Sequence, residues 1–228
     1  GFEADLRRDA GKLVGRSEEL DTLRRLLRET REGVLWLTGP AGIGKTYLVA
    51  RIASELLDEA PPDTVVLPYR FKAGDDRCSR DAFLTFALER LQARGDRPDE
   101  TEQDEKRTPL DRLKDALSSI GETRVLFILD GLDEVAERDA LFAREVPLAL
   151  GGPGVLWLCA GRPERGLVEA FTPESCSHVF PGGVPALGSG DVRTMLLEKI
   201  GPLRKRLVAH DREAGEKVTN AFVEKVTT

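Results

Sequence analysis

The chain has 228 residues, 40% of them hydrophobic, which suits one large α/β domain or a domain with a small appendage. Acidic residues outnumber basic ones, 40 to 34, and the formal net charge of -6 argues against tight general binding to nucleic acids or anionic membranes. Its three cysteines match neither a disulfide framework nor zinc spacing, and no apolar run approaches transmembrane length. We therefore expect a cytoplasmic protein.

The first part of the chain is polar and carries no clear functional motif. Residues 1–12 are expected to form a linker or a short leading helix. A turn at Gly15 and Arg16 precedes a predicted helix, for which Ser17 is the expected N-cap because its hydroxyl can accept from a free backbone N–H. On physical grounds alone, this turn can equally be an ordinary helix start. The buried face of the helix is expected to consist of Leu20, Leu23 and Leu27.

A glycine-rich stretch then stands between a predicted strand and a predicted helix. Residues 34–37 form an apolar run typical of a buried strand, and residues 48–57 have a helical apolar pattern. Between them, residues 39–46 match the P-loop pattern Gly-x4-Gly-Lys-[Ser/Thr] at every specified position. Such a loop turns backbone N–H groups toward phosphates at a helix N-terminus, where the dipole is positive. Lys45 is expected to reach the β- and γ-phosphates, and Thr46 to ligate Mg²⁺.

The next segments are predicted from hydrophobic pattern and composition. We expect a second strand over residues 64–71, despite a proline within it, and a helix over residues 83–91. Residues 94–108 lack hydrophobic side chains, which predicts a solvated, mobile loop. Pro109 is expected to begin the following helix, because proline is favoured at the first helical position.

A second chemical motif follows that helix. Five consecutive apolar residues, 125–129, predict a strand buried on both faces, as in parallel sheets. Asp130 ends the strand, where open α/β sheets bind ligands, and an acid there can hold Mg²⁺. Gly131 is small enough not to crowd a phosphate. Asp133 and Glu134 come within one helical turn, so one of them is expected to orient or deprotonate the attacking water.

The last motif is an arginine at the end of another strand. A helix is predicted around residues 139–150 and a strand over residues 155–159. Arg162 follows this strand, and a guanidinium at that edge of the sheet is suited to contacting a γ-phosphate. Spacing alone leaves open an arginine in a solvated loop. A short strand and two helices are expected further on, at residues 179–180, 192–200 and 218–226.

Taken together, the motifs at residues 14–18, 39–46, 129–134 and 160–163 resemble the STAND class of P-loop NTPases. The resemblance is greatest to the NACHT branch, with the NB-ARC branch close behind. The most specific feature is the Asp-Gly-Leu-Asp-Glu form of the third motif. NACHT-type proteins carry a small residue after the magnesium acid and another acid three positions on, which is Asp133 in this chain.

This resemblance implies an α/β fold, a three-layer P-loop NTPase sandwich whose five parallel strands have the order 5-1-4-3-2. It implies an NTPase domain at residues 13–185 and the start of a C-terminal helical lid subdomain at 186–228, ending before a winged helix. In this fold Arg162 would face the γ-phosphate, and the turn at Gly15 and Arg16 would lie near the adenine or ribose. We interpret the chain as the core of a larger, bacterial-type protein with effector and sensor domains elsewhere.

The function implied is a signalling switch in immunity or regulation. ADP would hold a closed monomer, and ATP with a trigger would favour an open, oligomerising form with slow hydrolysis. The cofactors implied are ATP or ADP and Mg²⁺, with no nucleic-acid or membrane partner.

Each candidate residue has an expected role. The catalytic candidates are Asp133, Glu134 and Arg162, and the metal ligands are Thr46 and Asp130. The expected nucleotide-binding residues are Val14, Gly15, Arg16, Gly39, Pro40, Ala41, Gly42, Ile43, Gly44, Lys45, Thr46 and Tyr47.

Two other functions remain open at this stage. One is a DNA-handling AAA-type ATPase, such as an initiator or loader, in which a polar Asn or Thr would be expected where Arg162 stands. The other is a nucleotide-binding scaffold without turnover. Salt-dependent DNA binding would favour the first, and absence of phosphate release would favour the second.

Overall fold

The computed structural model describes residues 2–93, 107–164, 166–197 and 217. The loop expected at residues 94–108 therefore lies mostly outside the described residues, the helix expected at 192–200 lies partly outside them, and the helix expected at 218–226 lies wholly outside them. Within these ranges, no helix has the length and apolar character needed to cross a membrane.

One parallel sheet forms the centre of the molecule. Its strand order is β2-β3-β4-β1-β5, so the predicted fold and the predicted order 5-1-4-3-2 are confirmed. Every strand is buried or nearly so apart from β5, as expected for a parallel sheet covered on both faces. The strands are β1 (Gly33–Thr38), β2 (Thr64–Arg70), β3 (Arg124–Asp130), β4 (Val155–Gly161) and β5 (Ser177–His178).

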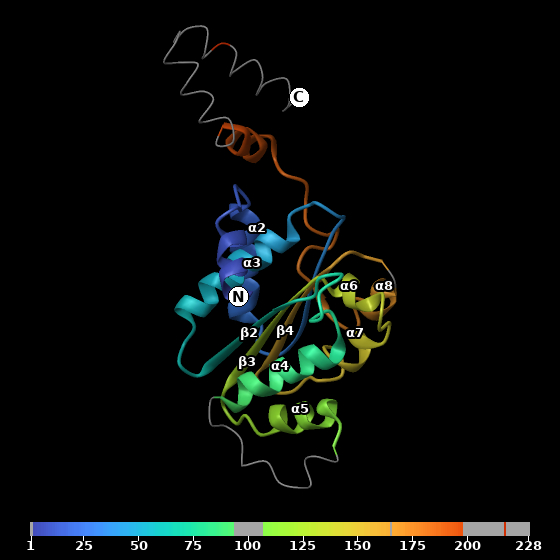
Figure 1. Ribbon diagram of the computed structural model, residues 1–228. Coiled ribbons are helices and arrows are strands. Elements are labelled where there is room, and N and C mark those ends of the chain that lie inside the picture. Colours follow the sequence, from blue (N-terminus) through green and yellow to red (C-terminus); the bar gives the residue numbers. More distant parts are fainter. Residues whose placement is uncertain (1, 94–106, 165, 198–216, 218–228) are drawn as a thin grey trace.

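Helices cover both faces of this sheet and make a three-layer sandwich (Figure 1). On one face lie α1 (Phe2–Ala10), α2 (Ser17–Glu29) and α3 (Lys45–Glu59), with α1 against α3. The other face is covered by α4 (Arg80–Gln92), α5 (Pro109–Ser118), α6 (Leu132–Ala136), α7 (Phe142–Glu145) and α8 (Leu167–Ala170).

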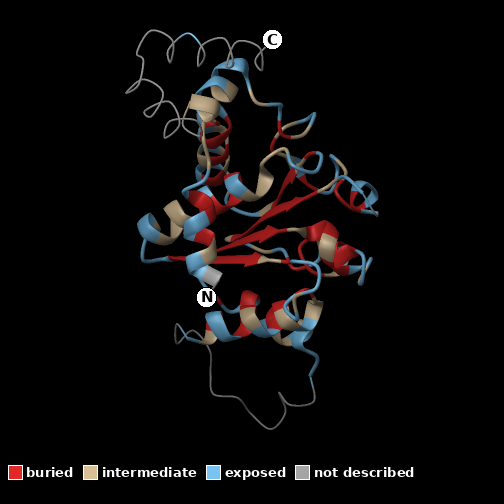
Figure 2. Ribbon diagram, turned by 45° about the horizontal axis from the view of Figure 1, so that its top comes forward, coloured by how far each residue is buried: buried red, intermediate tan, exposed pale blue. Residues whose placement is uncertain are grey.

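The alternation of side chains along each strand produces two separate cores, and Figure 2 shows the buried sheet between them. Phe127 and Trp157 point toward α4, and their rings stack with centroids 3.8 Å apart. Ile128 and Leu158, one position on, pack instead against α2 and α3. Burying each of these side chains contributes about 1.5–3 kcal/mol to folding, so the sheet is a rigid base for its loops.

The prediction of one helix around residues 139–150 is wrong. Only Phe142–Glu145 is helical there, and α6 is a separate short helix before it. The cause is Pro147, which supplies no backbone N–H and disfavours the helical region for Val146, whose φ and ψ are -109° and -84°.

Smaller differences occur at element ends. Helix α2 begins at Ser17 itself, and Arg16 occupies the N-cap position with a φ of 65° and no side-chain cap, so Ser17 is not the N-cap. Strand β5 lies at Ser177–His178, two residues before the expected position. Residues 2–10 form a helix with Leu6 and Ala10 buried.

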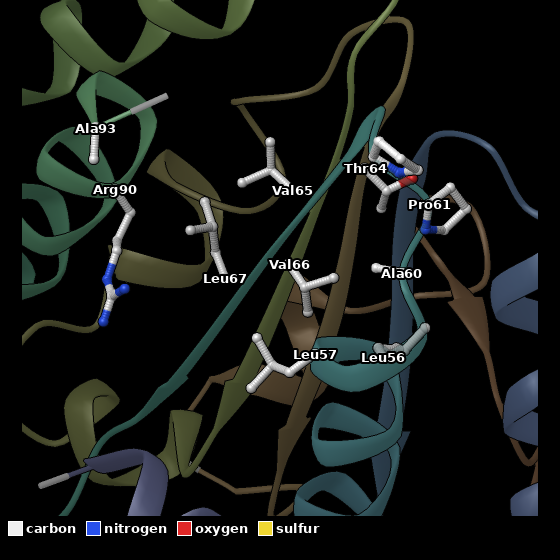
Figure 3. Close-up of a pocket in the computed structure, with 11 residues that line it drawn as sticks. Leu56, Leu57, Ala60, Pro61, Thr64, Val65, Val66, Leu67, Arg90 and Ala93 are labelled. Carbon is white, nitrogen blue, oxygen red and sulfur yellow. The ribbon is translucent and has the colours of Figure 1, made fainter. Parts of the chain in front are cut away.

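A cavity of about 350 Å³ opens at the β2 edge of the sheet, between α3 and α4 (Figure 3). Leucine, valine, alanine and proline side chains form most of its wall. Arg90 is the one charged residue among those described as lining it, so this cavity has no group suited to phosphate or metal chemistry beyond a single cation.

Candidate functional site

Four strands end at one edge of the sheet, where a cavity of about 410 Å³ lies among their loops. The register aligns Thr38 of β1 with Gly161 of β4, and Arg70 of β2 with Asp130 of β3. Residues distant in sequence therefore meet at the carboxyl ends of the strands. The lining residues are Ala41, Gly42, Lys45, Thr46, Arg70, Phe71, Lys72, Asp130, Gly131, Asp133, Glu134, Gly161 and Arg162.

The P-loop curls over the N-terminus of α3. Gly42 and Gly44 have φ angles of 76° and 101°, which favour glycine. Lys45 extends back over the loop and its Nζ donates to the carbonyl oxygens of Gly39, at 2.6 Å, and Pro40, at 3.0 Å. Burial lowers the pKa of Lys45, against the opposing charges of nearby carboxylates. The ammonium is thus held where a phosphate oxygen could replace these carbonyls.

A hydroxyl and a carboxylate meet beside the loop. The Oγ1 of Thr46 donates to Oδ1 of Asp130 at 3.2 Å. Asp130 is almost fully buried, and burial raises the pKa of its carboxyl, whereas Arg70 and Thr46 act in the opposite direction. Two hard oxygen donors side by side fit Mg²⁺, which takes few protein ligands and completes its shell with water and phosphate. The described residues contain no cluster of three or more His, Cys, Asp or Glu suited to holding a metal.

Arg162 connects the two other acids. Its backbone N–H and its Nε donate to the two carboxylate oxygens of Asp133, and its second terminal nitrogen donates to Oε1 of Glu134 at 2.9 Å. The side chain of Asp133 is 6% exposed and that of Glu134 is 26% exposed. Both oxygens of Asp133 therefore accept from Arg162 at the end of β4, whereas Glu134 is the acid more open to the cavity. The hydrogen bond with Asp133 raises the pKa of Arg162.

Arg16 lies beneath the P-loop and is only 2% exposed. Its guanidinium donates to Oε1 of Glu19 at 2.6 Å and to the carbonyl oxygens of Ile43, at 2.8 Å, and Pro185, at 2.5 Å. It joins α2, the P-loop and the segment leading to the last described helical turns. These protein acceptors occupy both terminal nitrogens, so Arg16 supports the loop from below. Contact with the base or ribose stays a prediction.

Only some of the predicted site residues line the cavity. Ala41, Gly42, Lys45, Thr46, Asp130, Asp133, Glu134 and Arg162 line it, and Gly39, Pro40, Ile43 and Gly44 complete the loop. Val14, Gly15, Arg16 and Tyr47 do not line it.

Sequence reasoning missed Arg70 and Lys72, which line the same cavity from the end of β2. A usable signal was present, because two basic residues stand at the carboxyl end of a strand that neighbours the Asp130 strand. Like Arg162, they add positive charge beside the P-loop.

A sequence profile described as "AAA ATPase domain" matches residues 12–146, more than half of the chain. The chain belongs to the AAA ATPase domain family. Membership identifies it as a P-loop, nucleotide-binding ATPase domain. No curated protein matches it.

Solved structures similar to this AAA ATPase domain include a Walker-type ATPase of Pyrococcus abyssi, at 18% identity and a TM-score of 0.45, covering 84% of this chain and 59% of that one. Another is PCH-2 of C. elegans, at 17% identity and a TM-score of 0.37, covering 91% of this chain and 47% of that one. The chain thus spans about half to three-fifths of the length of these proteins.

Gly131 of this AAA ATPase domain provides a test of the site's geometry. Its φ is 81°, and a Cβ would lie 2.4 Å from the backbone oxygen of Phe71, so the backbone that follows β2 leaves no room for a side chain at this position. We expect Gly131→Ala to lower the free energy of unfolding by about 3 kcal/mol, combining backbone strain with overlap. The measurement is urea denaturation followed by circular dichroism.

The matched control is Gly74→Ala. Gly74 has a φ of 80° but nothing within 4 Å of a built Cβ, so only the strain of about 1 kcal/mol applies. Equal losses at the two positions would show that the contact with Phe71 is unimportant.

Proposed function

We propose that this chain is the ATP- and Mg²⁺-binding, slowly hydrolysing core of a STAND-type switch protein. The observation that carries the proposal is the contact of Arg162 with both Asp133 and Glu134 at the cavity that the P-loop lines. A guanidinium so placed can exchange a carboxylate for the γ-phosphate of ATP. ADP offers no such group, so the exchange distinguishes the two nucleotides and gives the differential contact that a switch needs.

The residues then have distinct roles in phosphoryl transfer. The P-loop N–H groups and Lys45 bind the β- and γ-phosphates, while Thr46 and Asp130 hold Mg²⁺, which when bound neutralises phosphate charge. Glu134 orients the attacking water and accepts its proton as the bond from water oxygen to the γ-phosphorus forms. The bond from that phosphorus to the bridging oxygen breaks, and ADP leaves with the electron pair. Arg162 neutralises charge on the transferring group.

The contacts of Gly15 and Arg16 support a link between the nucleotide and the end of the described chain. A Cβ on Gly15 would overlap Asp191, and Arg16 bonds to both Ile43 of the P-loop and Pro185. Displacement of the segment around Pro185 would therefore disturb the support of the loop. We propose a domain boundary here, with the NTPase domain at residues 13–185 and a helical lid beginning at 186.

A DNA-handling AAA-type ATPase is the second candidate, because the family match is compatible with it. Arg162 in place of a polar Asn or Thr, together with the net charge of -6, favours the switch. Binding to duplex DNA that weakens steeply with salt would reverse this preference.

The test of the proposal is Arg162→Ala. We expect ATP affinity to fall about tenfold and ADP affinity to change by less than about twofold, since only ATP carries the γ-phosphate that Arg162 would bind. Equilibrium titration with fluorescent ATP and ADP measures both values. Arg144→Ala, which removes an exposed arginine of α7, is the control and should alter neither affinity. Equal losses for the two nucleotides, or no loss, would contradict the proposed role of Arg162.

A further inference from the structure

Arg70 connects the acid of the metal site to the first helix. Its Nε donates to Oδ2 of Asp130 at 2.9 Å, and a terminal nitrogen donates to Oδ2 of Asp9 at 2.8 Å. The three side chains are largely buried, with 20%, 7% and 10% of their surfaces exposed for Arg70, Asp130 and Asp9. Such ion pairs are far less screened by solvent than surface pairs, so removal of one charge is felt by its neighbours.

Asp9 belongs to the last turn of α1, which lies beside α3 (Figure 1). Leu6 and Ala10 bury the apolar side of the helix in the same core as α3. Arg7 forms a separate ion pair with Asp58 of α3 at the surface. Burial opposes ionisation of Asp9, but hydrogen bonds from Arg70 and Lys12 outweigh burial and lower the pKa of its carboxyl.

We propose that Arg70 and Asp9 are positioning residues of the magnesium site, which makes α1 a part of the nucleotide-binding machinery. The inference rests on the proposed function. Arg70 takes Oδ2 of Asp130 and leaves Oδ1 facing the hydroxyl of Thr46, so it sets which carboxylate oxygen is presented to a metal. Asp9 in turn holds the guanidinium in this orientation.

The charges of Arg70 and Asp9 determine whether the loss of Asp9 strengthens or weakens Mg²⁺ binding. Arg70 brings a positive charge next to the acid that would bind Mg²⁺ and therefore opposes the metal. Asp9 offsets that charge, because it shares the same guanidinium. Neutralising Asp9 removes this offset, so more of the charge of Arg70 acts on Asp130, and metal binding should weaken.

The experiment compares nucleotide affinity in Mg²⁺ and in EDTA for the full chain, using fluorescent ATP as the probe. We expect Asp9→Asn to reduce the gain in affinity from Mg²⁺ on the order of fivefold, with affinity in EDTA unchanged. In an Arg70→Gln background, the same substitution should have no effect, because the connection is already broken. Asp9→Glu, which keeps the charge, should restore the metal dependence.

Arg7→Gln is the matched control, because it breaks the ion pair between α1 and Asp58 of α3 without touching Arg70. A similar loss in Arg7→Gln would mean that helix docking alone matters, and would overturn the proposal. So would an unaltered metal dependence in Asp9→Asn, or an equal effect with and without Arg70. The proposed function is untouched by these results if the parent still binds ATP in a metal-dependent way. Failure of the parent to do so overturns both.

A measurement on the parent chain covers the case in which the Asp9 variants do not fold. Amide hydrogen exchange in residues 6–12 is expected to slow when Mg²⁺ is added to the ATP-bound protein, since positive charge held at Asp130 would repel the guanidinium of Arg70 and strengthen its pairing with Asp9. Unchanged exchange in that segment overturns the proposal.

Discussion

Lys45→Ala is expected to lower ATP affinity by about a thousandfold, to a level that leaves no measurable binding at micromolar nucleotide. The ammonium lies over the P-loop, where Gly39 and Pro40 hold it, and it is partly desolvated. In such an environment a charge-assisted contact with phosphate is stronger than at the surface. No neighbouring cation replaces it from within the loop. Titration calorimetry with ATP and Mg²⁺ measures the loss.

The structure predicts that this variant folds. Lys45 lines the solvent-accessible cavity and Pro40 is exposed, so water can replace the ammonium at the Pro40 carbonyl. Thermal unfolding should therefore change little. Lys114→Ala on the exposed side of α5 removes the same charge elsewhere and should bind ATP like the parent. ATP affinity retained in Lys45→Ala would refute phosphate binding by this loop.

Glu134→Gln is expected to slow phosphate release about a hundredfold while ATP affinity stays within about threefold of the parent. The substitution keeps the size of the side chain and removes the carboxylate that would accept the proton of water. Glu134 does not contact the P-loop or the metal ligands, and the amide oxygen of the glutamine can still accept from Arg162, so the groups that bind ATP are kept. Single-turnover release of phosphate, measured with a coupled fluorescent sensor, separates the chemical step from product release.

Asp133→Asn is the informative comparison. Because both oxygens of Asp133 accept from Arg162, its loss should act through the position of that arginine and slow hydrolysis less than the loss of Glu134. Strong slowing in Asp133→Asn alone would assign the water-activating role to Asp133. Parent rates in both variants would remove both acids from the mechanism.

Much of the fold is predictable because local signals agree with one another. Each central strand is a run of apolar residues, and the P-loop supplies glycines where the backbone needs positive φ. The order of the strands came from the resemblance to a known class. The error at residues 139–150 has a local cause, since the apolar periodicity there continues across Pro147, which the helix cannot.

The site was harder to predict where it depends on contacts between distant segments. Asp130 and the P-loop carry recognisable patterns, and the cavity brings them together. The sequence does not indicate that the guanidinium of Arg16 is buried. Its acceptors at Ile43 and Pro185 are backbone oxygens, which every residue type carries. Arg70 and Asp9 pair through the register of β2 on β3 and the docking of α1, neither of which local sequence determines.

Hydrogen exchange of the parent chain with and without ATP and Mg²⁺ tests most directly whether the nucleotide binds at the ends of β1, β3 and β4. The predicted result is slower exchange in residues 39–47 and 130–134, with no change around the cavity at the β2 edge, residues 56–66. Unchanged exchange in the P-loop at saturating ATP, or protection confined to the β2 edge, would contradict the account.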